Sequence, residues 1–314
     1  MSDLTIQIGD LTLRNPIMPA SGTFSEELAD VFDLGILGAH VTKTITQQIR
    51  GGNPTPRVCE VQGGMLNSIG IPSKGVAYFK NNVIPFYSRF DTPLIVSISA
   101  DTTEGFVELC KDISVDGVAA IEVNISCPNI EDNGKAFAMR PSSTHMVLKQ
   151  LRASTSLPLW AKLTPNTGET IEVAEAASDA GADALVVSNT MLSMAVDVHS
   201  RKPKLGNLMG GLSGPALKPI ALRMAYQCAR AVKIPVIGCG GISNLDDVLE
   251  FLIAGASAVQ VGTATFLNPT IMPSIISGLQ AYLRDHQIDY VSELVGSILD
   301  TDLSENLSIM EVAP

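Results

Sequence analysis

Short apolar runs alternate with longer amphipathic stretches along almost the whole chain. The runs are bounded by Gly, Pro or Asn, which is typical of buried strands in a parallel sheet, and the stretches between them have helical periodicity. Strands are expected at residues 17–20, 39–43, 94–97, 121–124, 159–163, 184–188, 235–239 and 258–261. Helices are expected at residues 26–32, 76–89, 104–115, 142–154, 169–180, 215–232, 245–253 and 270–284. Since the composition does not change along the chain, this alternation predicts a single (β/α)8 TIM barrel of the α/β class.

A doubly wound sheet is the competing fold, because it also alternates strands with helices. Its phosphate-binding signature is missing, however. The best glycine cluster, Gly238-Cys239-Gly240-Gly241-Ile242-Ser243, has serine in place of the third glycine and follows the seventh expected strand rather than the first. Two short runs at residues 5–8 and 11–13 predict an N-terminal β-hairpin that closes the bottom of the barrel. We expect one domain over residues 1–314, with the hairpin within residues 1–14 and a loose tail at residues 300–314.

Three connections are much longer than the roughly 2 to 6 residues that usually join a strand to the next helix. They cover residues 44–75, 127–141 and 189–214. Each follows a strand, so each is expected as a long loop at the C-terminal face of the barrel, where barrel active sites lie. The sequence therefore predicts a functional site at this mouth.

Charge and composition exclude several classes of partner. The chain has 21 Lys and Arg against 32 Asp and Glu, a formal net charge of −11, which argues against nucleic acid or an anionic membrane. No basic leader precedes an apolar run, and no apolar run reaches about 18 residues, so a cytoplasmic protein is expected. The 5 cysteines form no C-x-x-C pair and the 4 histidines have no ligand spacing, so no disulfide, iron–sulfur cluster or metal site is expected.

Two adjacent loops could bind a phosphate group. The loops after the seventh and eighth strands, residues 238–241 and 261–264, offer bare backbone N–H groups and a hydroxyl in the place where barrels commonly bind phosphate. The alternative is that these glycines only form tight turns at strand ends.

Lys43 and Lys162 end two of the apolar strands, where lysine is rarely found without a partner. A flavin mononucleotide (FMN) would supply both the phosphate for the glycine loops and, when reduced, a negative charge for a lysine. The alternative is that each lysine extends from its strand end into solvent.

Neutral amides also gather at the predicted mouth. Asn124, Cys127 and Asn129 follow the fourth strand, while Asn67, Asn189 and Thr190 lie in the long connections. Asparagine offers both a donor and an acceptor, which suits the edge of a pyrimidine ring. Taken singly, each Asn could instead bond its own backbone in a turn, and Cys127 could be a buried structural thiol. Pro128 and Gly134 favour a mobile lid around an accessible thiol.

Six segments together carry a resemblance to a known family. They are residues 15–22 (NPIMPASG), 52–57 (GNPTPR), 65–70 (MLNSIG), 124–129 (NISCPN), 162–166 (KLTPN) and 210–219 (GGLSGPALKP). The chain resembles the class 1 dihydroorotate dehydrogenases over about residues 4–299, and is most similar to the class 1B catalytic subunits. Two positions depart from the 1B pattern, since Ser97 stands where Asn is usual and Ser188 replaces an apolar residue.

The resemblance implies FMN-dependent oxidation of (S)-dihydroorotate to orotate in pyrimidine biosynthesis. Cys127 would be the base that removes the C5 proton while the C6 hydride passes to N5 of FMN. The implied FMN contacts are Ser21, Lys43, Thr44, Asn124, Lys162, Ser188, Gly214, Gly240, Gly241, Gly262 and Thr263. The implied substrate contacts are Lys43, Asn67, Ser68, Ile69, Gly70, Asn124, Asn129, Asn189 and Thr190.

The resemblance also implies a partner, because this chain has neither a cysteine cluster nor a dinucleotide signature. A subunit with FAD and [2Fe–2S] would pass electrons to NAD, in a heterotetramer built on a catalytic homodimer. Ser97 favours an alternative, a class 1A-like enzyme that reduces fumarate. Two further alternatives are a dihydropyrimidine dehydrogenase-like reductase, whose catalytic Cys would fall at Ala138-Met139-Arg140, and a barrel aldolase with a Schiff base on Lys43 or Lys162.

Overall fold

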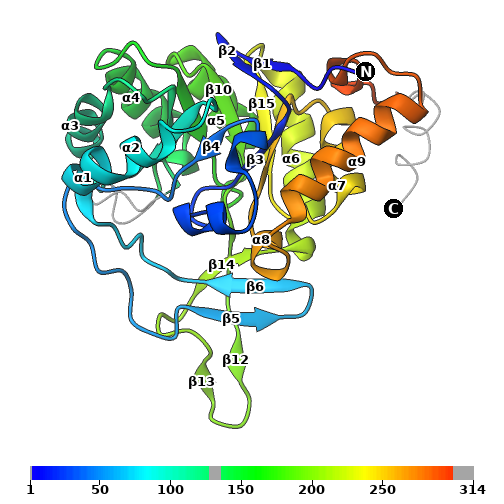
Figure 1. The fold of residues 1–314 in the computed structure, drawn as a ribbon. Helices are drawn as coiled ribbons and strands as arrows, with labels where there is room; N and C mark the ends of the chain where they lie inside the picture. The colour runs from blue at the N-terminus through cyan, green and yellow to red at the C-terminus, as the bar shows by residue number, and fades with distance from the viewer. Residues whose placement is uncertain (1, 127–135, 300–314) are drawn as a thin grey trace, which may run out of the picture.

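A ring of eight parallel strands forms the centre of the molecule (Figure 1). The computed structural model describes residues 2–126 and 136–299. The strands are β3 (Ile17–Pro19), β4 (His40–Val41), β7 (Leu94–Ile98), β8 (Ala120–Asn124), β9 (Leu159–Lys162), β10 (Ala184–Val187), β15 (Val236–Cys239) and β16 (Ala258–Val261). Consecutive strands of this set pair with one another from β4 to β16, and β16 pairs with β3. Between β3 and β4, the Gly38 N–H donates to the Ile17 carbonyl at 2.8 Å. The predicted (β/α)8 barrel and its strands are confirmed.

Helices pack around the outside of this ring. They are α1 (Gly75–Tyr78), which continues through a π-helical stretch (Phe79–Val83) into α2 (Ile84–Tyr87), then α3 (Thr103–Ile113), α4 (Pro141–Arg152), α5 (Thr170–Asp179), α6 (Lys218–Ala231), α7 (Leu245–Ile253), α8 (Ala264–Leu267) and α9 (Ile271–Asp285). Asn244 caps the N-terminus of α7, because its side chain accepts a hydrogen bond from the Asp247 N–H.

The helix expected at residues 26–32 is wrong. The chain there forms only a 3-10 turn, Glu26–Asp30, in which none of the residues is buried. Acidic side chains at Glu26, Glu27 and Asp30 leave this segment without a continuous apolar face to pack on the barrel.

The core lies in two layers separated by the strands. Alternate strand residues, such as Met18, Ile95 and Trp160, point into the barrel and form one cluster with the N-terminal hairpin. The other strand residues pack against the helices in a second, larger cluster. The hairpin consists of β1 (Ile6–Ile8) and β2 (Leu11–Leu13), so the predicted closure of the barrel's bottom is confirmed.

The two longest connections were expected to be loops, but each contributes strands to a second sheet. β5 (Val58–Val61) and β6 (Gly64–Asn67) come from one connection; β11 (Met191–Ser193) and β14 (Gly210–Ser213) come from the other. They form an antiparallel sheet of order β11-β14-β6-β5, from which the β12 (Val196–Asp197) and β13 (Lys202–Pro203) arm projects (Figure 1). The sequence could not show this sheet, because β6 and β14 pair across a long separation and carry no alternating apolar pattern.

Two sets of predictions fall on residues that the structure does not describe. One is the lid favoured by Pro128 and Gly134, with Cys127 and Asn129, and the other is the tail at residues 300–314. The single domain over residues 1–314 also stays a prediction. Among residues 2–126 and 136–299, no helix is long and apolar enough to cross a membrane.

Candidate active site

A cavity of about 430 Å³ lies between the C-terminal ends of the barrel strands and the antiparallel sheet. Most of the predicted site residues line it: Ser21, Lys43, Thr44, Asn67, Ile69, Gly70, Asn124, Lys162, Ser188, Asn189, Thr190, Gly214, Gly240, Gly241, Gly262 and Thr263. Ser68 is not among the lining residues, because its hydroxyl accepts hydrogen bonds from Asn53 and Asn207 at 2.9 and 3.0 Å. The structure thus brings together segments spread over most of the chain.

The glycine loops form one end of the cavity. Gly240 and Gly241 have φ of +131° and +78°, a backbone conformation that side chains disfavour. A Cβ on Gly241 would lie 2.5 Å from the Lys218 backbone nitrogen, so this turn has no room for one. Asp247 fastens the turn, because it accepts from the Ser243 N–H at 2.7 Å and pairs with the Lys218 ammonium at 2.7 Å. The loop is therefore a backbone cradle that has no side chains at Gly240 and Gly241 and is fixed by Asp247.

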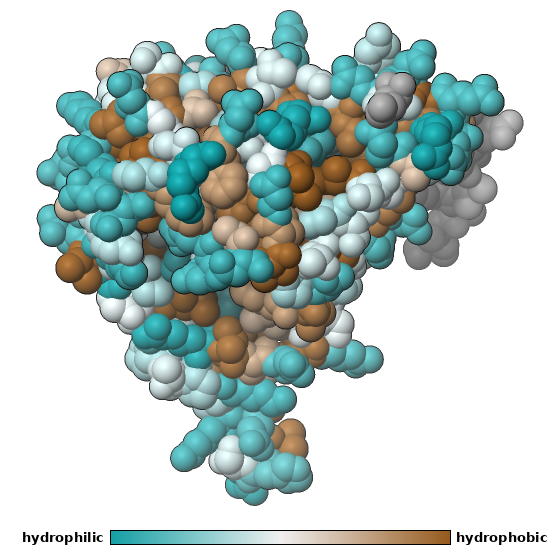
Figure 2. All heavy atoms as spheres, in the orientation of Figure 1, coloured by the Kyte–Doolittle hydropathy of each residue, from teal (hydrophilic) through white to brown (hydrophobic). Residues whose placement is uncertain are grey.

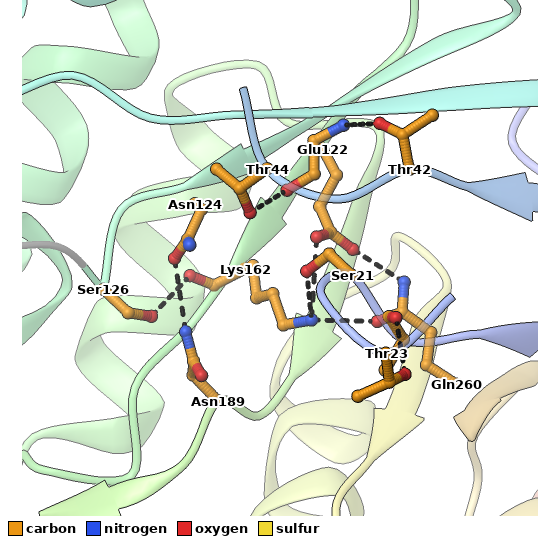
Figure 3. Close-up of polar contacts among 12 residues, drawn as sticks. Ser21, Thr23, Thr42, Thr44, Glu122, Asn124, Ser126, Lys162, Asn189 and Gln260 are labelled. Carbon is orange, nitrogen blue, oxygen red and sulfur yellow. Dashed lines mark hydrogen bonds and ion pairs between the residues drawn. The ribbon is translucent and has the colours of Figure 1, made fainter. Parts of the chain in front are cut away.

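A buried lysine stands at the centre of the site (Figure 3). Lys162 donates to the Gln260 side-chain oxygen at 3.0 Å and to the Ser21 hydroxyl at 3.2 Å. Its ammonium lies 3.6 Å from Oε1 of Glu122, a carboxylate that is fully buried. Burial opposes the charge on Lys162, but the nearby carboxylate of Glu122 raises its pKa above the usual value. The lysine is thus held as a cation.

The sequence analysis did not identify Glu122 or Gln260 as site residues. Both point into the barrel, as the alternation of β8 and β16 requires, since Ala120 and Ala258 two positions earlier belong to the interior cluster. The same alternation that marked the strands could have found them. Lys162 thus has an anionic partner inside the protein itself.

The amides gather on the other side of Lys162. Asn189 donates to the side-chain oxygen of Asn124 at 3.2 Å and accepts from the Thr190 N–H at 2.8 Å. Asn67 reaches the cavity from β6 and donates to the Gly211 carbonyl at 3.2 Å. These contacts fix the direction of each amide, so the wall presents oriented donors and acceptors.

Lys43 lines the cavity near the amides. Its side chain is open to solvent at the cavity wall. The protein around it still removes part of its hydration, and this desolvation together with the positive charge of Arg57 lowers its pKa. The two serines that depart from the 1B pattern are both buried. Ser97 bonds the Thr44 hydroxyl at 2.9 Å, and Ser188 donates to the Asn189 carbonyl at 3.1 Å.

Within the described part of the chain, no group of three or more His, Cys, Asp or Glu residues could hold a metal ion. The fold and the cavity define a (β/α)8 barrel enzyme whose mouth combines a glycine backbone cradle, a buried cation and oriented amides. The family model described as dihydroorotate dehydrogenase matches residues 3–283. The chain belongs to the dihydroorotate dehydrogenase family.

Individual relatives agree with this assignment over nearly their full length. A protein of Pelobacter propionicus is 48% identical over 299 residues, which are 94% of this chain and 98% of the relative. One from Geotalea uraniireducens is 47% identical over 300 residues (95% and 98%). One from Desulforamulus reducens is 48% identical over 298 residues (94% and 98%). All three are named dihydroorotate dehydrogenase B (NAD(+)), catalytic subunit.

Proposed function

We propose that this chain binds FMN and oxidises (S)-dihydroorotate to orotate, as the catalytic subunit of an NAD-linked enzyme. The observation that carries the proposal is the cavity itself, which joins the Gly240–Gly241 cradle to Lys162 and the amides of Asn67, Asn124 and Asn189. The names of the relatives supply the substrate and the acceptor.

The residues present fit FMN. The cradle at Gly240 and Gly241 has a backbone conformation and a lack of side-chain space that suit a phosphate. Thr263, whose hydroxyl donates to Ser213 at 2.8 Å, lies beside it at the start of α8. Lys162 is a buried cation that lines the same cavity, where it would face the pyrimidine edge of a flavin. Bound there, FMN would supply the hydride acceptor.

In this mechanism the protein positions the substrate and removes one proton. The amides of Asn67, Asn124 and Asn189 hold the dihydroorotate ring by its imide and urea groups, and Lys43 faces its carboxylate. The C5 proton is acidic because it lies α to a carbonyl, and Cys127 accepts it as the base. Asn129 joins the substrate contacts. Both Cys127 and Asn129 stay predictions from the sequence.

A Schiff base on Lys162 is disfavoured by its surroundings. A nucleophilic lysine needs a lowered pKa, whereas the pKa of Lys162 is raised and its ammonium is paired with Glu122. The aldolase alternative at this residue therefore has no support from the site.

We also propose a homodimer that binds a partner subunit carrying FAD and [2Fe–2S]. The relatives' name, catalytic subunit, implies that those proteins have a partner. Exposed apolar side chains gather on the antiparallel sheet and its arm, namely Leu192, Met194, Val196, Val198, Leu208 and Met209. In Figure 2 the projecting arm is mostly hydrophilic, with apolar atoms among the polar ones. These side chains offer contact area for another chain.

The isolated chain should turn over dihydroorotate with an artificial dye but not with NAD. The reason is that only the proposed partner would connect FMN to NAD. The assay measures orotate formed with dye, NAD or fumarate as the sole oxidant. Rapid NAD reduction by the isolated chain would refute the need for a partner. Rapid fumarate reduction would favour the class 1A alternative, to which Ser97 points.

Substituting Gly241 by alanine is expected to weaken FMN binding by about 10-fold or more. The added Cβ meets the Lys218 backbone and opposes the φ of +78°, so the cradle must distort. Fluorescence titration of the FMN-free protein measures the dissociation constant. Gly168→Ala is a matched control, because a Cβ there meets nothing within 4 Å. Equal affinity for all three proteins would contradict the cradle.

A further inference from the structure

The proposed mechanism assigns no role to Glu122, a buried charged residue. Glu122 is fully buried inside the barrel, and Figure 3 shows its carboxylate beside Lys162 and Gln260 rather than beside Asn124 or Asn189. Its Oε2 accepts a hydrogen bond from Gln260 at 2.6 Å, while its Oε1 accepts none from the described residues. Burying a carboxylate costs several kcal/mol unless a partner compensates it, so its position calls for a physical reason.

Gln260 connects Glu122 to Lys162 in a fixed direction. Its side-chain oxygen accepts from the Lys162 ammonium at 3.0 Å, so its amide nitrogen must be the group that donates to Glu122. Gln260 is itself fully buried. The ammonium thus has three oxygens around it, from Gln260, Ser21 and Glu122. This arrangement fixes the position of the Lys162 amino group and favours its protonated form.

Two titratable groups of the described residues face Lys162: Glu122 from β8 and Cys239 from β15. Burial raises the pKa of the Cys239 thiol, so this group is neutral near pH 7. The other two neighbours are Ser21, which follows β3, and Gln260 from β16, and neither side chain titrates. Glu122 is therefore the negative charge that balances Lys162.

We propose that Glu122 and Gln260 are positioning residues for the flavin: Glu122 keeps Lys162 protonated throughout the cycle, and Gln260 aims its ammonium at the pyrimidine edge. The inference rests on the proposed binding of FMN. With Lys162 charged in both redox states, reduction of the flavin draws no proton to this lysine. The protein thereby presents a constant charge to the flavin.

Glu122→Gln separates this role from a merely structural one, because it keeps the shape and removes the charge. At low pH, Lys162 stays protonated and its charge is no longer balanced, so the midpoint potential of FMN lies above that of the wild type. As the pH rises, Lys162 in this variant loses its proton while the flavin is oxidised, because burial disfavours the unbalanced charge. The lysine gains a proton when the flavin is reduced. One extra proton per two electrons steepens the potential by about 30 mV per pH unit.

The measurement is the FMN midpoint potential of the purified holoenzyme from roughly pH 6 to 9, for the wild type, Glu122→Gln and Asp183→Asn. Asp183 is a matched control, since it pairs with Arg152 at 2.9 Å near the start of β9, the opposite end of the strand from Lys162. The midpoint potential of Asp183→Asn should have the same pH dependence as that of the wild type. If the midpoint potential of Glu122→Gln has the same pH dependence as that of the wild type, and is equal or higher at every pH, the proposal is overturned.

Gln260→Leu tests the positioning and does not depend on the folding of Glu122→Gln. It leaves the carboxylate in place but removes the amide that aims the ammonium, so we expect FMN to bind about 10-fold more weakly. Affinity equal to that of the wild type would refute the role of Gln260. A wild-type chain that binds no FMN would refute the proposed function as well, whereas a Glu122→Gln protein that binds FMN and has the pH dependence of the wild type refutes this inference alone.

Discussion

Replacing Cys127 by serine is expected to retain FMN and orotate binding and to lower turnover by about 10²- to 10⁴-fold near pH 7, the usual range for loss of a general base. A hydroxyl is a far weaker acid than a thiol of pKa about 8.5, so its oxyanion is much scarcer. Stopped-flow reduction of the bound flavin by dihydroorotate measures the step directly. Cys59→Ser is a suitable control, because Cys59 lies on β5 and is not among the residues that line the cavity.

The same base predicts a pH dependence. Reduction by the unmodified protein should accelerate from roughly pH 6 to 9 as the thiol ionises, while the serine variant should need higher pH. If both proteins reduce the flavin at the same rate near neutral pH, Cys127 is not the base.

The second large effect concerns Lys162. Lys162→Ala leaves Glu122 as an unpaired charge inside the barrel, and breaking a buried ion pair in this way costs roughly 3–5 kcal/mol. Urea unfolding of the FMN-free protein should show this loss as a lower midpoint. The double variant Lys162→Ala with Glu122→Gln should recover part of the lost stability, because it no longer has an unpaired carboxylate inside the barrel. A single variant as stable as the wild type would contradict the pairing.

Loss of Lys162 should also weaken flavin binding and lower its midpoint potential. Removing a positive charge disfavours the anionic reduced flavin, and each 1.4 kcal/mol corresponds to about 30 mV for a two-electron couple. Potentiometric titration of the variant holoenzyme checks the sign. An unchanged or raised potential with FMN still bound would count against the placement of this lysine.

The barrel could be predicted from the sequence because its strands are buried on both sides and its helices have one apolar face. Local periodicity records both facts, as at β9 and α7. It failed at residues 26–32, where acidic residues leave only a 3-10 turn. It could not reveal the antiparallel sheet, since β6 and β14 are short, partly buried and distant in sequence.

The site could be predicted in outline because the ends of parallel strands meet at one mouth. This rule places Lys162, Asn124 and the glycine turn together from the sequence alone. Glu122 was not predicted as a site residue, although the alternation of its strand directs its side chain into the barrel. The motif could not show that the Ser68 hydroxyl turns to Asn53 and Asn207, and its substrate contact stays a prediction.

Anaerobic addition of dihydroorotate to the purified protein tests the central claim most directly. If the cavity binds FMN and substrate as proposed, the protein is yellow, and its flavin absorbance bleaches on addition of dihydroorotate while an equivalent amount of orotate forms. A protein without flavin, or a flavin that stays oxidised under excess dihydroorotate, would contradict the account.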